Sequence, residues 1–181
     1  WAGQKVEDLS KGMAQKIQFI ATVIHEPQLL ILDEPFSGFD PVNANLIKDE
    51  ILELREKGAT VIFSTHRMES VEQLCEHIAM IHKSEKILDG TKKEIKNSFR
   101  SDKYKVEYKG DFSGLGAEYE LLDTKHLEDG FYEAVIQSKN GHNPNHLLSQ
   151  LIAKTEVHSF VEVIPSVNDI FISIVEGGNK K

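Results

Sequence analysis

The chain has 181 residues, of which 40% are hydrophobic and 28% are charged, a composition typical of one or two globular domains. Its net charge of −8 and isoelectric point near 5.5 disfavour a nucleic-acid partner and direct docking on anionic lipid. No apolar run reaches the roughly 20 residues of a membrane helix, and the single cysteine, Cys75, excludes an internal disulfide.

The sequence pattern of residues 1–64 predicts two helices that alternate with two strands. Residues 10–24 carry apolar side chains at helical spacing, and residues 41–57 do so again between a proline and a glycine. Four consecutive aliphatic residues, 29–32, predict a strand buried on both faces, and residues 60–64 predict a second strand. A strand, helix and strand of these lengths predict a parallel pair with a right-handed crossover.

The remaining residues predict a change of fold class. A helix over 67–75 and strands over 78–81 and 86–88 complete the first part. Beyond residue 101 the pattern predicts strands over 104–108, 119–122, 131–137 and 158–164, a helix around 147–152 and a final helix over 167–175. We therefore predict an α/β domain over residues 1–98 and a small α+β domain over residues 101–177, for which a split β-α-β arrangement is one candidate.

Two adjacent carboxylates, Asp33 and Glu34, follow directly after the first predicted strand. Open α/β sheets bind their ligands at the carboxyl ends of parallel strands. One carboxylate there can hold a magnesium ion while its neighbour handles an attacking water. A solvated strand edge or a helix cap is the alternative interpretation of such a pair.

Three other segments place polar side chains at the start of a predicted helix or after a predicted strand. Ser10 and Gly12 stand at the start of a predicted helix, whose N–H groups favour a phosphate, although Ser10 is also an ordinary N-cap. His66 follows the second strand as Asp33 follows the first, and its alternative is a hydrogen-bonded loop residue. Asp40 precedes Pro41 and predicts an N-cap for that helix.

Taken in order, four segments resemble the motifs of an ATP-binding cassette (ABC) ATPase. Leu9-Ser10-Lys11-Gly12-Met13 resembles the signature motif, and the strand ending in Asp33-Glu34 resembles the Walker B strand. Ser37-Gly38-Phe39-Asp40 resembles the D-loop, and Ser64-Thr65-His66 resembles the switch histidine. The resemblance covers residues 1 to about 98. The segment 165–171 resembles the end of an accessory domain that follows the ATPase in some bacterial exporters.

The resemblance implies a role for each matching residue. Asp33 would orient Mg²⁺, and Glu34 and His66 would be catalytic. Ser10, Lys11, Gly12 and Asp40 would contact ATP across a dimer. The usual signature reads Leu-Ser-Gly-Gly-Gln, so Lys11 adds positive charge here, and Met13 lacks the hydrogen bonds of the amide.

No G-x-x-x-x-G-K-[ST] segment occurs in the chain, so the phosphate-cradling Walker A loop is missing from it. Because the first motif also begins by residue 9, after Trp1, we expect a C-terminal part of a longer subunit that is inactive alone. The resemblance implies the ATP-hydrolysing subunit of a bacterial transporter, more specifically an exporter.

That subunit would use ATP and Mg²⁺, pair with a second ATPase subunit and drive an integral membrane permease. It would lie at the cytoplasmic face of the membrane without inserting into it. Two alternatives stay open: an ABC ATPase outside transport, and a regulatory or interaction role for residues 101–177.

Overall fold

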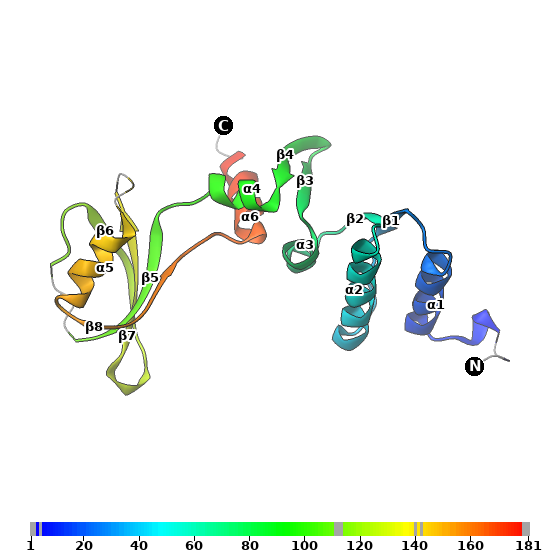
Figure 1. The fold of residues 1–181 in the computed structure, drawn as a ribbon, viewed down its shortest axis with the longest axis horizontal. Coiled ribbons are helices and arrows are strands. Elements are labelled where there is room, and N and C mark those ends of the chain that lie inside the picture. The colour runs from blue at the N-terminus through cyan, green and yellow to red at the C-terminus, as the bar shows by residue number, and fades with distance from the viewer. Residues whose placement is uncertain (1–2, 4, 111–113, 140, 142, 179–181) are drawn as a thin grey trace. The chain divides into compact units, whose positions relative to one another are not determined.

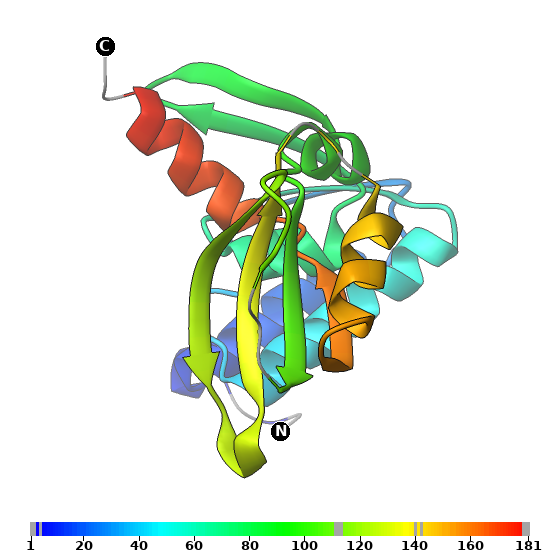
Figure 2. The same cartoon turned by 90° about the vertical axis from the view of Figure 1, so that its left-hand side faces the viewer.

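The computed structural model describes residues 3, 5–110, 114–139, 141 and 143–178. The chain forms two compact units, Trp1–Cys75 and Glu76–Lys181. Figure 1 and Figure 2 show the elements of both units from two directions.

The first unit contains one short 3₁₀ helix, three α-helices and two strands among its described residues. In chain order these are the 3₁₀ turn Val6–Asp8, α1 (Lys11–Val23), β1 (Leu29–Asp33), α2 (Pro41–Glu56), β2 (Thr60–Ser64) and α3 (Met68–Leu74). Strands β1 and β2 pair in parallel, from Leu29 opposite Thr60 to Asp33 opposite Ser64. The predicted strand–helix–strand unit is therefore confirmed.

One face of this strand pair is buried and the other is open. Leu30 is only 2% exposed, and on its side of the sheet a core forms from Phe19, Phe36, Ile47, Ile51 and Leu74. On the opposite face, Ile31 is 68% exposed and Ile62 is 55% exposed. The prediction that the first strand is buried on both faces is wrong for this chain, because the helices of this unit cover only the Leu30 face.

The second unit combines a hairpin with a four-stranded sheet. Its elements are β3 (His77–His82), β4 (Glu85–Thr91), α4 (Lys92–Ser98), β5 (Lys103–Lys109), β6 (Tyr119–His126), the 3₁₀ turn Glu128–Gly130, β7 (Tyr132–Ser138), α5 (Pro144–Ile152), β8 (Glu156–Glu162) and α6 (Val167–Gly178). Strands β3 and β4 pair antiparallel. The larger sheet has the order β6-β7-β5-β8.

The larger sheet confirms the split β-α-β arrangement. Strands β7 and β8 both pair antiparallel with β5, so they run parallel to each other with β5 between them, and α5 connects them. Leu147 and Leu151 of α5 are buried against β-sheet side chains that include Val106 and Ile136. This unit therefore has a hydrophobic core of its own. Among the described residues, no helix is both long and apolar enough to cross a membrane.

Candidate active site

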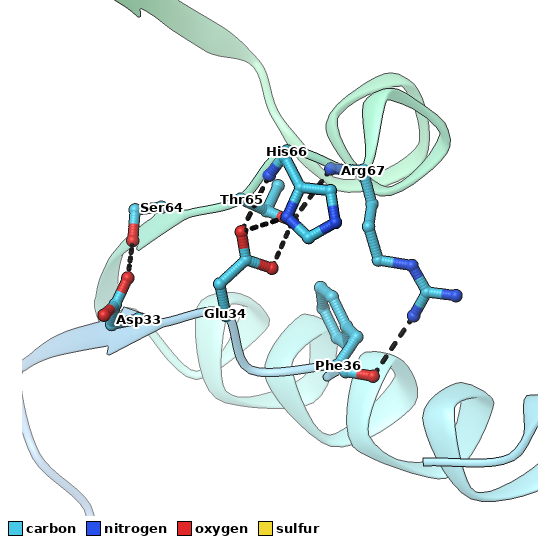
Figure 3. Close-up of polar contacts among 7 residues, drawn as sticks. All are labelled: Asp33, Glu34, Phe36, Ser64, Thr65, His66 and Arg67. Carbon is cyan, nitrogen blue, oxygen red and sulfur yellow. Dashed lines mark hydrogen bonds and ion pairs between the residues drawn. The ribbon is translucent and has the colours of Figure 1, made fainter. Parts of the chain in front are cut away.

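The polar residues at the carboxyl ends of β1 and β2 lie together at one edge of the strand pair (Figure 3). Asp33 and Ser64 end the two strands and face each other in the parallel register. The hydroxyl of Ser64 donates a hydrogen bond to the Asp33 carboxylate. The fold therefore places the carboxylates at the carboxyl edge of the sheet, as predicted, because neighbouring parallel strands end side by side.

Glu34 lies one residue beyond β1 with an unusual backbone conformation. Its φ is 44°, in the left-handed region that non-glycine residues rarely adopt. Two main-chain hydrogen bonds hold it there: Glu34 N donates to Ser64 O at 3.0 Å, and Ser37 N donates to Glu34 O at 3.0 Å. Such conformations occur where the surroundings enforce them, and they cluster at functional sites.

The side chain of Glu34 crosses to the segment that follows β2. Its Oε1 accepts a hydrogen bond from His66 N at 2.9 Å and lies 2.6 Å from His66 Nδ1. Its Oε2 accepts from Thr65 Oγ1 at 3.1 Å. Partial burial raises the pKa of Glu34, but the hydrogen bonds from His66 and Thr65 outweigh it and leave the pKa below the ordinary value. Glu34 is therefore ionised at neutral pH.

Two residues that the sequence interpretation did not assign support this arrangement. Thr65 Oγ1 donates to Glu34 and also accepts from Arg67 N at 3.1 Å. Arg67 Nη1 donates to the carbonyl of Phe36 at 3.1 Å, so it joins the segment after β2 to the segment after β1. Both residues directly flank His66 in the sequence, which is the signal that could have identified them.

The predicted signature residues stand at the start of α1. Ser10 caps this helix, with Oγ accepting from Met13 N at 3.3 Å. The alternative interpretation of Ser10 as an N-cap therefore holds, and the hydroxyl hydrogen can still donate to an anion. Lys11 is exposed and Gly12 is half-buried. In the described part of the chain, no hydrogen bond joins Ser10, Lys11 or Gly12 to the Glu34 cluster.

Asp40 caps α2 as predicted. Its Oδ1 accepts from Val42 N at 3.0 Å and from Asn43 N at 3.1 Å, and the Asn43 side-chain amide donates to Oδ2. The hydrogen bonds from Asn43, main chain first, lower the pKa of Asp40. Asp40 is thus ionised and fixed at the positive end of a helix dipole.

A cavity of about 290 Å³ borders the carboxylates. Its lining includes Gln15 of α1, Ile31, Asp33 and Glu34 of the β1 segment, and Phe39. Its volume is close to the lower end of the range of small-molecule sites, about 300–1,000 Å³.

Two family models match the chain. The model described as "ATP-binding protein DrrA1-3-like, C-terminal domain" matches residues 90–175. A model of an AAA domain matches residues 3–72.

Curated relatives match almost the whole chain. An ABC transporter ATP-binding protein of Bacillus subtilis is 41% identical over 97% of this chain and 58% of its own length. Another, of Alkalihalophilus pseudofirmus, is 40% identical over 95% of this chain and 63% of its own length. Over almost its whole length the chain is therefore similar to ABC transporter ATP-binding proteins.

A further relative in the ABC family carries a more specific name. The fluoroquinolones export ATP-binding protein of Mycobacterium tuberculosis is 40% identical over 59% of this chain and 35% of its own length. The chain spans about three fifths of the length of the first two relatives. The recognition of the ABC family from four short motifs is confirmed. So is the fold class, the C-terminal part of a P-loop ATPase followed by a small α+β domain.

ATP binding by ABC proteins implies a magnesium ion, and the oxygen atoms of Asp33 and its neighbour suit that ion. The Asp33 carboxylate and the Ser64 hydroxyl are both oxygen donors, the type that Mg²⁺ prefers. Within the described ranges, no group of three or more His, Cys, Asp or Glu side chains could hold a metal. Mg²⁺ in nucleotide sites uses one or two carboxylates and takes its other ligands from phosphates and water, so Asp33 fits this ion.

Proposed function

We propose that this chain supplies the catalytic carboxylate and the switch histidine of the ATP-hydrolysing subunit of a bacterial ABC exporter. The observation that carries the proposal is the contact of the ionised Glu34 carboxylate with both His66 and Thr65, at the carboxyl edge of a parallel strand pair.

Glu34 is the group that handles the attacking water. An ionised carboxylate can accept a hydrogen bond from water and polarise it, and its lowered pKa keeps it in that form. The left-handed backbone and the hydrogen bonds to His66 and Thr65 fix its position before substrate arrives. Positioning supplies most of the catalysis of phosphoryl transfer.

His66 and Asp33 serve the phosphates. Because Nδ1 of His66 faces Glu34, Nε2 is the ring nitrogen that hydrogen-bonds the γ-phosphate. Asp33, oriented by the Ser64 hydroxyl, would hold Mg²⁺. When bound, this ion neutralises charge that develops on the phosphate oxygens.

The residues at the helix starts serve a second subunit. Ser10, Lys11 and Gly12 present a hydroxyl, a positive charge and main-chain N–H groups at the N-terminus of α1, all suited to the γ-phosphate of ATP held by the opposite subunit. Asp40 faces the same dimer interface. The dimer drives an integral membrane permease from the cytoplasmic face of the membrane, and the export relative supports the direction of transport.

We also propose that residues 1–98 are the ATPase part and residues 101–177 an accessory domain. The separate hydrophobic core of the four-stranded sheet supports this division. A domain with a core of its own can also carry a second function, in which it binds a regulatory ligand or protein. A ligand that raises the melting temperature of residues 101–177 alone would favour this second function.

The test is ATP turnover by an ABC subunit that carries these residues together with a Walker A loop. We expect Glu34→Gln to abolish turnover and to accumulate ATP-bound dimers in size-exclusion chromatography. The matched control is Glu56→Gln, an exposed residue at the end of α2, which should leave turnover unchanged. Near-normal hydrolysis by Glu34→Gln would show that another group handles the water.

A companion measurement uses the 181 residues alone. Without a Walker A loop they lack the phosphate cradle, so we expect no ATP turnover and at best weak ATP binding. Micromolar ATP binding with turnover by this chain would contradict the proposal that its active site is incomplete.

A further inference from the structure

We propose that Gln15 is a positioning residue that links α1, which begins with the phosphate-binding Ser10, to the turn that holds Glu34. This inference rests on the proposed function of these two residues. Gln15 lies in the second turn of α1, outside the four motifs.

The link is a long-range hydrogen bond. Gln15 Nε2 donates to the carbonyl of Ser37 at 2.9 Å, across 22 positions of sequence. Ser37 in turn donates its own N–H to the carbonyl of Glu34 at 3.0 Å. Gln15 is therefore two hydrogen bonds away from the backbone of the catalytic carboxylate, and its donation to Ser37 holds the turn that keeps Glu34 in its left-handed conformation.

The packing around the Gln15 amide shows that this contact is close and specific. Gly38 has φ of 80°, and a Cβ built on it would lie 2.8 Å from Gln15 Oε1. The left-handed φ favours glycine here, and a Cβ would have to push the end of the Gln15 side chain aside. The turn therefore meets Gln15 directly, with no space for a side chain between them.

The oxygen of the Gln15 amide also indicates that the hydrogen bond to Ser37 is specific. Oε1 of Gln15 is buried, and within the described part of the chain it has no hydrogen-bond donor. A buried acceptor without a partner costs free energy, which an apolar side chain of the same size would avoid. Stability alone therefore does not explain a glutamine here, whereas the hydrogen bond to Ser37 does.

Two variants, one apolar and one isosteric, test the link in the subunit that carries a Walker A loop. Gln15→Leu removes the donor, and Gln15→Glu replaces it with a carboxylate that repels the Ser37 carbonyl at neutral pH. We expect kcat to fall about tenfold in each, which corresponds to about 1.4 kcal/mol, with KM for ATP within about twofold of wild type. Gln28→Leu, an exposed glutamine at the other end of β1, is the control and should keep wild-type kcat.

The pH profile separates positioning from a general loss of structure. A protonated carboxyl can donate to the Ser37 carbonyl as the amide does. The kcat of Gln15→Glu relative to wild type should therefore rise as pH falls, whereas that of Gln15→Leu should stay flat. Equal, flat ratios for both variants would overturn the inference. So would unchanged kcat in Gln15→Leu, or a higher KM with normal kcat.

Hydrogen exchange on the 181-residue chain gives a readout that needs no ATP turnover. In Gln15→Leu the Ser37 amide should exchange faster, while the amides in the middle of α1 keep their protection. Unchanged exchange at Ser37 would overturn the inference even where the wild type proves inactive. An inactive wild type would instead contradict the proposed function.

Discussion

His66 holds Glu34 through two different atoms. The Glu34 carboxylate accepts from the main-chain N–H of His66 at 2.9 Å and lies 2.6 Å from its ring Nδ1. The main-chain contact fixes where the carboxylate sits, whatever the protonation state of the ring. The ring contact orients the imidazole, whose side chain is 81% exposed and has few other constraints.

The hydrogen bonds to Glu34 predict a pH-dependent contribution to stability. The pKa of Glu34 is lowered in the fold from its ordinary value of 4.5. A lowered pKa means that the ionised form stabilises the fold above the unfolded-state pKa, and that this contribution disappears as pH falls through the folded-state pKa. Glu34→Gln, which cannot ionise, should therefore be less stable than wild type near neutral pH, and the difference should shrink in acid.

Urea unfolding of both proteins at several pH values, from neutral down through the folded-state pKa of Glu34, measures this difference. Glu56→Gln, whose carboxylate is exposed on α2, is the control for general charge effects. A difference that stays constant from neutral to acidic pH would show that the carboxylate charge of Glu34 adds nothing to stability.

The sequence predicted the parts of this site that depend on local pattern. The aliphatic run before Asp33 predicted a buried strand, and the proline after Asp40 predicted a capped helix start. The parallel pairing of β1 and β2 followed from the strand–helix–strand spacing. These features need no knowledge of which side chains meet in space.

The features that the sequence did not predict depend on long-range contacts or on coverage of the sheet. Arg67 donates a hydrogen bond to the carbonyl of Phe36, and Gln15 donates one to the carbonyl of Ser37. No local spacing in the sequence predicts such hydrogen bonds. The exposure of Ile31 depends on which elements cover the sheet. Helix α4 was not predicted either, although its signal is local. Thr91 and Glu94 form a capping box, and its T-x-x-E spacing is visible in the sequence.

The cap at Asp40 predicts a difference between two small substitutions. Asp40→Ala removes the acceptor for Val42 N and Asn43 N, whereas Asp40→Asn keeps an oxygen that can cap α2. We expect Asp40→Ala to lower the melting temperature by several degrees and Asp40→Asn to lower it less.

Thermal unfolding followed by circular dichroism measures both variants. If the two variants melt together, the charge of Asp40 and not its capping oxygen sets the stability of this helix start. A retained melting temperature with lost turnover in Asp40→Asn would separate the capping role from the proposed role at the dimer interface.

The open face of the strand pair predicts opposite results for two neighbouring residues. Leu30 is 2% exposed and Ile31 is 68% exposed, although both are aliphatic and adjacent on β1. Leu30→Ala should create a cavity in the core and lower the free energy of unfolding by about 2–5 kcal/mol. Ile31→Ala removes a side chain that already faces solvent, so the change should stay within about 0.5 kcal/mol.

Chemical denaturation of the 181-residue chain, with size-exclusion chromatography to record its oligomeric state, measures the pair. Because the two substitutions share strand, residue class and size of truncation, the difference between them isolates burial. A loss at Ile31 as large as that at Leu30 would mean that the Ile31 face is covered in solution. A concentration-dependent elution volume would then identify self-association through this face as the cause.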